Sequence, residues 1–245
     1  MILDIDAGNS FVKWRVMDGS NLVARGAKAT EEVMAGRLTF DAVDTLTRAR
    51  LSSVANQDLA KALQKQIQKK FGVALKIARV SDNVAGVSCG YTEPDTLGID
   101  RWLASIAAYQ KYSRAVLVVD AGSAITIDLV GPQGEHLGGY ITPGLALMHE
   151  ALWKGTDKVQ VKGEDPLNML VPGVCTHDAV NRGCLLAAVA MIEKLASQYP
   201  ASIVITGGDA QALVEAISLP SDHQPDLVLE GLAVGGVELT GTIMQ

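Results

Sequence analysis

Two short segments of the sequence carry the same residue types at the same spacing, and both could bind phosphate. The first reads IDAGNS from position 5, and the second reads VDAGSA from position 119. In each, an aspartate ends an apolar run and a glycine follows two residues later. A glycine lets a ligand approach the backbone closely, and exposed backbone N–H groups can bind an anion. The pattern predicts two matching turns that bind an anionic ligand.

The two aspartates, Asp6 and Asp120, lie close to half the chain length apart. Each segment follows one extended run and precedes two more, so the order strand, glycine turn, strand, turn, strand is used twice. Two copies of one supersecondary unit indicate a duplicated domain with a ligand-binding cleft between the halves. We therefore expect an α/β protein with two domains, 1–114 and 115–245.

The remaining elements follow from the hydrophobic spacing and from helix-capping residues. Helices are predicted at 58–71, 100–112, 145–154 and 176–198, and a glycine-rich helix is predicted at the C-terminal end. Further strands are predicted at 50–54, 73–80, 203–205 and 227–229. The polar segments 81–98 and 155–173 are predicted to be loops. Loops of this length are often functional.

Composition excludes several classes of protein. The net charge is −6 and the only basic pair is Lys69-Lys70, so neither nucleic acid nor an anionic membrane surface is an expected partner. The three cysteines have no metal-ligand spacing, which favours free thiols in a reducing cytoplasm. Asp4 and Asp6 interrupt the first apolar run, so no signal peptide is predicted. The longest apolar stretch, 184–192, is too short to span a membrane.

Several motifs that carry well-known chemistry are missing from the sequence. There is no Walker A loop, dinucleotide-binding fingerprint, HExxH zinc motif or GxSxG elbow. The turn at 6–10 remains, and in it Ser10 and Lys13 could reach phosphate oxygens while Asp6 could hold Mg²⁺ through water. The alternative is an ordinary β-turn closed by an Asx bond. The second copy of the turn favours the ligand-binding interpretation.

Two such turns facing a cleft resemble the actin-like, sugar-kinase and heat-shock-chaperone superfamily, whose third element is a glycine turn packed on adenosine. Within it, this chain closely resembles the type III pantothenate kinases over essentially its full length. The matching motifs are DAGNS at 6–10, GIDR at 98–101, DAGSA at 120–124 followed by Thr126 and Asp128, GGYITPG at 138–144, Thr176 with Ala179 and Gly183, and TGGD at 206–209. One departure is Ser123, where threonine is usual, so we expect altered packing but retained phosphate contact.

The resemblance implies duplicated ribonuclease-H-like domains whose mixed sheets are flanked by helices. It also implies ATP-dependent phosphorylation of pantothenate to 4′-phosphopantothenate, the first step of coenzyme A synthesis. The residues it assigns to ATP are Asp6, Ala7, Gly8, Asn9, Ser10, Phe11, Val12, Lys13 and Ser123. The residues it assigns to pantothenate are Tyr91, Gly98, Ile99, Asp100, Arg101 and Thr176. Asp120 would bind K⁺ or NH₄⁺, which the family requires beside Mg²⁺, and the family is a cytoplasmic homodimer.

By this resemblance Asp100 is the general base on the pantothenate hydroxyl. Phosphoryl transfer depends mainly on positioning and charge neutralisation, with one carboxylate to accept the proton. Asp100 opens a predicted helix, whose dipole favours an ionised carboxylate, but it could serve only as a helix cap. Arg101 could likewise pair with the substrate carboxylate or bridge surface carboxylates.

Two other functions remain open from the sequence. One is a kinase of the same superfamily that acts on a sugar, which the short chain and the lack of a cysteine-rich zinc loop disfavour. The other is a non-catalytic nucleotide-binding regulator, possible because some members of the family were first seen as accessory factors for transcription. An intact Asp100, both turns and the acidic charge balance count against that role.

Overall fold

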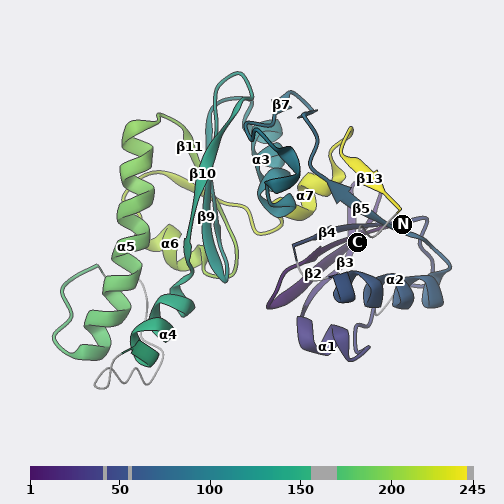
Figure 1. Cartoon of the computed structure of the whole chain (residues 1–245), viewed down its shortest axis with the longest axis horizontal. Coiled ribbons are helices and arrows are strands. Elements are labelled where there is room, and N and C mark those ends of the chain that lie inside the picture. The colour runs from purple at the N-terminus through teal and green to yellow at the C-terminus, as the bar shows by residue number, and fades with distance from the viewer. Residues whose placement is uncertain (41–42, 55–56, 156–169, 242–245) are drawn as a thin grey trace. The chain divides into compact units, whose positions relative to one another are not determined.

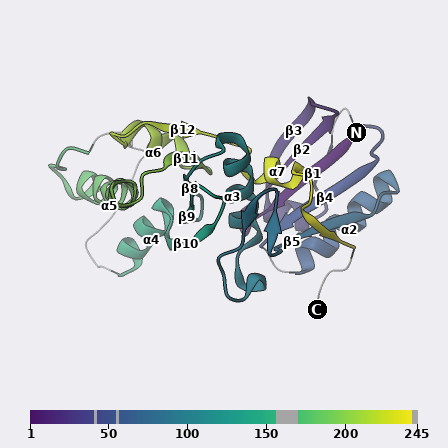
Figure 2. The same cartoon turned by 90° about the horizontal axis from the view of Figure 1, so that it is seen from above.

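The computed structural model describes residues 1–40, 43–54, 57–155 and 170–241 (Figures 1 and 2). Contacts divide the chain into two compact units. Unit 1 comprises Met1–Ala107 together with Leu227–Gln245, and unit 2 comprises Ala108–Asp226. Residues 156–169 of the predicted loop at 155–173 lie outside the described residues. Within the described ranges, no helix combines the length and the apolar character that a membrane span requires.

Unit 1 is built on a six-stranded mixed sheet with the order β13-β5-β4-β1-β2-β3. Its strands are β1 (Ile2–Ala7), β2 (Phe11–Asp18), β3 (Asn21–Ala29), β4 (Arg48–Ser53), β5 (Leu75–Arg79) and β13 (Glu238–Thr240). Strand β1 runs antiparallel to β2 and parallel to β4. The helices are α1 (Thr30–Met34), α2 (Gln57–Phe71), α3 (Ile99–Tyr112), which continues into unit 2, and α7 (Leu227–Ala233). A small hairpin, β6 (Asn83–Val84) and β7 (Val87–Ser88), and a 3₁₀ turn, Pro94–Thr96, precede α3.

Unit 2 repeats this arrangement with a five-stranded sheet in the order β10-β9-β8-β11-β12. Its strands are β8 (Val116–Ala121), β9 (Ala124–Val130), β10 (His136–Pro143), β11 (Ser202–Thr206) and β12 (Ser221–His223). Its helices are α4 (Leu145–Gly155), α5 (Thr176–Gln198) and α6 (Ala210–Ala216). The order matches β3-β2-β1-β4-β5 of unit 1 strand for strand, with the same antiparallel and parallel pairs. The predicted duplicated α/β fold is confirmed.

Strand alternation sorts apolar and charged side chains onto opposite faces of the unit 1 sheet. Leu3, Ile5 and Ala7 of β1 are fully buried in a core that also contains Leu59, Leu63 and Ile67 of α2. These three positions recur at the four-residue helical spacing that predicted α2. Helices α1 and α2 therefore lie along one face of this sheet, as Figure 1 shows. The opposite face carries Asp4 and Asp6, because successive residues of a strand point to opposite sides.

Asp4 is a fully buried carboxylate that holds two guanidinium groups. Its Oδ2 accepts a hydrogen bond from Arg15 Nε at 3.2 Å, and its Oδ1 accepts one from Arg50 Nε at 2.7 Å. Arg15 also donates from Nη2 to the carbonyl oxygen of Leu229 at 2.7 Å. This network joins β1, β2 and β4 to the C-terminal helix α7. It gives a physical reason for α7 to belong to unit 1 although α7 follows the whole of unit 2 in sequence.

The C-terminal region differs from the sequence prediction in two ways. The predicted strand at 227–229 is the first turn of helix α7, where Leu227, Val228 and Leu229 are all buried. Short apolar runs do not distinguish a buried strand from a buried helix, which explains the error. The second domain was expected to be 115–245 and so to include this segment, whereas the contacts assign Leu227 onward to unit 1. The boundary at the start of unit 2 lies between Ala107 and Ala108, within α3.

We predict that Asp4→Asn lowers the free energy of unfolding by about 3 to 5 kcal/mol, because it leaves the buried guanidinium group of Arg15 and the partly buried one of Arg50 without their counter-charge. Urea-induced unfolding at pH 7 measures this loss. Asp58→Asn is the control, since Asp58 forms an exposed pair with Lys61 at 3.9 Å and its substitution should change stability by about 0.5 kcal/mol or less. A similar small effect at Asp4 would contradict the role given to this network.

Candidate active site

The first aspartate–glycine turn joins β1 to β2 and is closed by its own backbone. Gly8 N–H donates to the carbonyl oxygen of Phe11 at 3.0 Å. Asp6 is half-buried on the face opposite the core and pairs in register with Lys13 of β2 and Ser52 of β4. The structure thus brings the Asp6 carboxylate and the Lys13 ammonium group to the same end of the same sheet face.

Not every residue of the predicted phosphate loop can offer its side chain to a ligand. Ala7 and Val12 are fully buried in the core of unit 1, so they could contact a nucleotide only through their backbone. Asn9, Ser10 and Phe11 are exposed.

Two hydrogen bonds from Thr30, at the start of α1, fix the backbone of this turn. Thr30 N–H donates to Ser10 O at 3.0 Å, and Thr30 Oγ1 donates to Gly8 O at 2.9 Å.

The second turn joins β8 to β9 and is one residue shorter. Here Gly122 N–H donates to Ala124 O at 3.0 Å. Asp120 is half-buried and pairs in register with Thr126 of β9 and Thr206 of β11. Ser123 is exposed at the tip. Both turns therefore have the same sheet position, with an aspartate at the entrance and hydroxyl-bearing or cationic neighbours.

Two glycines allow neighbouring backbone to lie directly against the second turn. A Cβ on Gly207 would lie 2.3 Å from Ala121 O, and the φ of Gly207 is +101°. Asp209 N–H donates to the same carbonyl oxygen at 2.9 Å. On the other side, a Cβ on Gly144 would lie 2.2 Å from Gly122 O. The TGGD segment thus packs on the second turn, an association that its distance in sequence did not reveal.

Asp100, Arg101, Tyr91 and Gly98 come together in unit 1 at the start of α3. Asp100 Oδ1 accepts a hydrogen bond from Arg101 N–H at 2.8 Å, which places the carboxylate at the N-terminal end of the helix. A Cβ on Gly98 would lie 2.7 Å from this oxygen, so a larger residue at position 98 would displace the carboxylate from the place it occupies here. Arg101 is buried, donates from Nη1 to Tyr91 Oη at 2.9 Å and lies 5.7 Å from the centre of the Tyr91 ring.

Ile99 and Thr176 are the other predicted substrate residues, and neither has a described side-chain contact with this cluster. Ile99 is buried in the core, so its side chain supports the start of α3. Thr176 is exposed at the first position of α5 in unit 2. Neither Thr30 nor a separate role for Gly144 was predicted from the sequence. The feature of the sequence that could have identified both residues is their position directly after the third strand of each repeat.

A group of polar side chains not predicted from the sequence lies near the second turn. Its members are His149 on α4, His177 on α5 and Asp209 before α6. Burial lowers the pKa of His149, and His177 adds to this effect while Asp209 opposes it. Burial also raises the pKa of Asp209, against the influence of His149. Within the described residues, His149 Nε2 and His177 Nδ1 are buried without a hydrogen-bond partner.

The oxygen-rich surroundings of both turns determine which cations they could bind. No group of three or more His, Cys, Asp or Glu side chains suited to a metal ion occurs in the described residues. Mg²⁺ is commonly held by substrate phosphates and water together with one or two carboxylates, and the aspartate of either turn could supply one. Asp120, flanked by two threonines, offers oxygen ligands of the type that a monovalent cation accepts.

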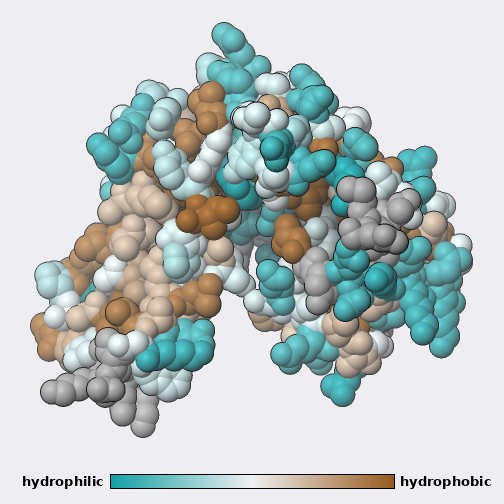
Figure 3. Space-filling model, viewed as in Figure 1, coloured by the Kyte–Doolittle hydropathy of each residue, from teal (hydrophilic) through white to brown (hydrophobic). Residues whose placement is uncertain are grey.

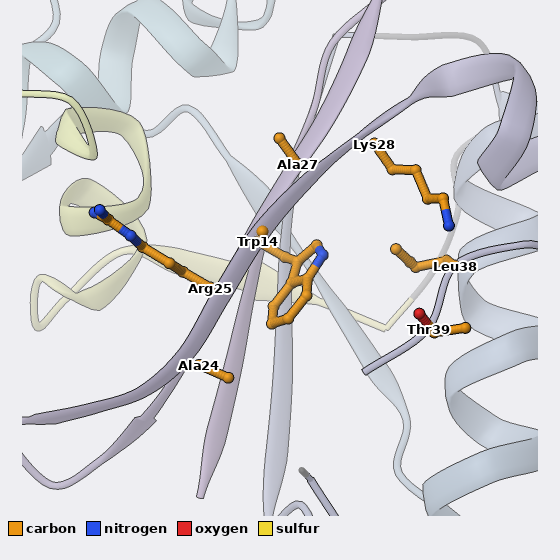
Figure 4. Close-up of a pocket in the computed structure, with 8 residues that line it drawn as sticks. Trp14, Ala24, Arg25, Ala27, Lys28, Leu38 and Thr39 are labelled. Carbon is orange, nitrogen blue, oxygen red and sulfur yellow. The ribbon is translucent and has the colours of Figure 1, made fainter. Parts of the chain in front are cut away.

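A pocket of about 300 Å³ beside Trp14 lies at the edge of the unit 1 sheet (Figure 4). Trp14, Lys28 and Leu38 lie on one side of β3, and Arg25 points to the other side. The remaining lining residues are Ala24, Gly26, Ala27 and Thr39. Lys28 Nζ donates to the carbonyl oxygen of Arg37 at 2.7 Å. Among the described residues that line the pocket there is no carboxylate and none of the predicted substrate residues.

Comparison with known proteins identifies a family match over most of the chain. Residues 2–198 match the family model of type III pantothenate kinase. The type III pantothenate kinase of Chromohalobacter salexigens is 38% identical over 95% of this chain and 86% of its own length. That of Ectopseudomonas mendocina is 39% identical over 96% of this chain and 98% of its own length.

Solved structures agree with the fold at lower identity. A Baf family transcriptional activator from Campylobacter jejuni superposes with a TM-score of 0.62, at 23% identity over 94% of this chain and 95% of its own. A 2-dehydro-3-deoxygalactonokinase from Sinorhizobium meliloti gives a TM-score of 0.56, at 13% identity over 95% of this chain and 97% of its own. At these identities the likeness supports the fold and not a shared activity.

We predict that His149 makes the protein less stable in acid. Because the pKa of His149 in the folded protein is lowered from 6.5, the unfolded chain binds a proton more readily and stability falls as pH drops below that value. His149→Gln should therefore show a smaller decrease in Tm than the parent protein between pH 7.5 and 5.5. Differential scanning calorimetry measures both curves. Parallel curves across this range would contradict the prediction.

Proposed function

Since this chain belongs to the type III pantothenate kinase family, we propose that its two aspartate–glycine turns bind the ATP phosphates and that Asp100 is the general base. The chain is an ATP-dependent kinase that phosphorylates pantothenate in coenzyme A biosynthesis. The observation that carries the site proposal is the repeat itself. Asp6 and Asp120 occupy the same position in two sheets of the same strand order, each followed by a glycine turn.

Asp100 is suited to accept the proton of the attacking hydroxyl group. Its carboxylate lies at the N-terminal end of α3, where the helix dipole and the Arg101 N–H favour the ionised form. An ionised carboxylate within reach of the pantothenate hydroxyl takes up its proton as the oxygen attacks the γ-phosphorus of ATP. The new P–O bond forms as the bond to the ADP oxygen breaks. The same hydrogen bond could serve as a helix cap, and both roles are compatible.

Arg101 and Tyr91 form a rigid polar surface beside Asp100. The buried guanidinium group is fixed by the Tyr91 hydroxyl at 2.9 Å and by the face of its ring. A guanidinium group held in this way can pair with a carboxylate in a defined orientation. We assign to it the pantothenate carboxylate, with Gly98 and the backbone of Ile99 shaping the wall and Thr176 as a further contact.

The proposed cations divide between the two turns. Mg²⁺ accompanies the ATP phosphates near Asp6, where Lys13 adds a second positive charge. K⁺ or NH₄⁺ binds at Asp120, because a weakly hydrated monovalent ion suits a single carboxylate flanked by hydroxyl groups. When bound, these ions neutralise phosphate charge. The remaining phosphate contacts come from the hydroxyl groups of Ser10 and Ser123 and from backbone N–H groups of the turns other than that of Gly8, which donates to Phe11 O.

We also assign the protein to the cytoplasm as a homodimer. Brown and tan atoms gather over α4 and α5 in Figure 3. Large apolar side chains exposed on α4, α5 and β10 are Leu147, Leu152, Trp153, Leu186, Leu137, Tyr140 and Ile141. Exposed apolar groups concentrated on one unit favour an interface with another chain. Sedimentation equilibrium that detects only monomer would contradict this assignment.

We predict that Asp100→Asn lowers kcat about 10²- to 10⁴-fold and leaves ATP affinity unchanged, because the amide keeps the shape but cannot accept the proton. A coupled assay of ADP formation with pantothenate measures kcat. The same assay with N-acetylglucosamine, and with no acceptor, should show background rates for the parent enzyme. Near-normal turnover of the variant would overturn the role of Asp100, whereas turnover with the sugar would overturn the substrate.

We predict that activity requires K⁺ or NH₄⁺ in addition to Mg²⁺. The parent enzyme assayed with Na⁺ or tetramethylammonium as the only monovalent cation should be nearly inactive, and titration with KCl should restore it. Asp120→Ala should weaken this response because it removes the single carboxylate of the proposed site. Full activity without K⁺, or an unchanged KCl titration in Asp120→Ala, would refute the cation site.

A further inference from the structure

The residue that follows the third strand has the same backbone contact in both repeats. Thr30 follows β3, and Gly144 follows β10. Thr30 N–H donates to Ser10 O at 3.0 Å, and Gly144 N–H donates to Ser123 O at 3.1 Å. Each acceptor is the last residue of its turn before the second strand. The two hydrogen bonds are therefore equivalent by position, although the sequences around Thr30 and Gly144 share no motif.

In unit 1 the threonine side chain adds a second bond. Thr30 Oγ1 donates to Gly8 O at 2.9 Å, so a single residue holds carbonyl oxygens at both ends of the Gly8–Ser10 turn. This arrangement has an electrostatic consequence. A carbonyl oxygen directed at a phosphate would repel it. The carbonyl oxygens of this turn instead accept hydrogen bonds from Thr30, which is a neutral donor. The turn is then held in a conformation that can offer N–H groups to an anion.

In unit 2 the turn is shorter, and the carbonyl group of Gly122, which corresponds to that of Gly8, lies directly against the residue that follows the third strand. A Cβ on residue 144 would lie 2.2 Å from Gly122 O and 2.7 Å from Ser123 O. No side chain fits in that space, so the backbone bond of Gly144 acts without a side-chain partner. The difference of one residue in turn length thus explains why threonine stands at one position and glycine at the other. Gly144 also accepts the first bond of α4, from Met148 N–H at 2.9 Å.

We propose that Thr30 and Gly144 are positioning residues for the two phosphate turns. They act on the turn backbone and do not contact the nucleotide. This inference rests on the proposed binding of ATP phosphates by the turns, and it extends that function to the first residue of the helix region in each repeat. A backbone displaced by a fraction of an ångström misaligns the phosphates and weakens ATP binding, whereas pantothenate contacts at Tyr91 and Arg101 are unaffected.

The first test compares Thr30→Val with Thr30→Ser in the full-length enzyme. Valine keeps the shape and the backbone bond but removes the bond to Gly8 O, so KM for ATP should rise about fivefold, the usual effect of one hydrogen bond. Serine keeps the hydroxyl group and should restore KM to near the parent value. KM for pantothenate should stay within about twofold for both variants.

Thr47→Val is the matched control for Thr30→Val. Thr47 Oγ1 donates to Met1 O at 2.9 Å, which is the same type of bond at the other end of β1. A purely structural effect would lower Tm in both valine variants without a selective change in KM for ATP. The proposal is overturned if Thr30→Val leaves KM for ATP unchanged, or if Thr47→Val raises it equally.

The second test compares Gly144→Ala with Gly155→Ala. The new methyl group at 144 must push the Gly122 carbonyl away, so KM for ATP should rise at least about tenfold. Gly155, at the end of the same helix, has no atom of the described residues within 4 Å of its Cβ position, and its alanine variant should behave like the parent. If Gly144→Ala does not fold, as judged by circular dichroism, the Thr30 pair alone decides the proposal.

Gly122→Ala separates this inference from the proposed function. A Cβ on Gly122 meets only ordinary contacts at 3.6 Å and 3.7 Å within the protein, so any increase in KM for ATP arises from a clash with bound phosphate. An unchanged KM for ATP in Gly122→Ala shows that the second turn does not bind ATP. For that turn, both the proposed ATP binding and the positioning role of Gly144 are then overturned. A raised KM in Gly122→Ala with parent-like Thr30→Val and Gly144→Ala keeps the proposed function and overturns the positioning role.

Discussion

Close backbone-to-backbone packing around the second turn is the constraint on which unit 2 depends. Ala121 and Gly122 lie between Gly207 and Gly144, and neither glycine has room for even a methyl group. The turn is thereby joined to the ends of β11 and β10 and to the first residues of α6 and α4. Contacts between main chains are stiffer than contacts between side chains, because they cannot relax by changing a rotamer. An exposed two-residue turn, which would otherwise be adaptable, is held in one conformation.

Unit 1 reaches the same result with different chemistry. Its turn is longer by one residue, and Thr30 fixes it through two hydrogen bonds, whereas unit 2 combines the one backbone bond of Gly144 with steric exclusion. The strand that leads into this turn is anchored four residues before Gly8 by buried Asp4 and its two arginines. A buried ion network of this kind contributes little net stability compared with an apolar core, but it is costly to disrupt, and it fixes the register of the strands that it joins.

Some residues of the site carry the charges that the reaction needs, and others keep those charged side chains in position. Asp100 is held by the start of α3 and by the space that Gly98 leaves, and Arg101 is held by Tyr91. Phosphoryl transfer makes few covalent demands on a protein, so orientation of this kind accounts for most of the catalytic effect. The glycines and hydroxyl groups that position the turns therefore matter to the reaction as much as the ionisable residues do.

The sequence by itself determined the duplicated strand order, the two aspartate–glycine turns and the helices α2, α3, α4 and α5, because each depends on local periodicity and short motifs. Motif resemblance also identified the kinase family. Tertiary structure alone decided that 227–229 is helical, that α7 belongs to unit 1, and that Thr30 and Gly144 contact the turns. Those outcomes depend on partners distant in sequence, such as Arg15 with Leu229 and Gly144 with Gly122. A local pattern cannot encode which distant backbone will lie within 3 Å, because that is fixed only when the sheets assemble.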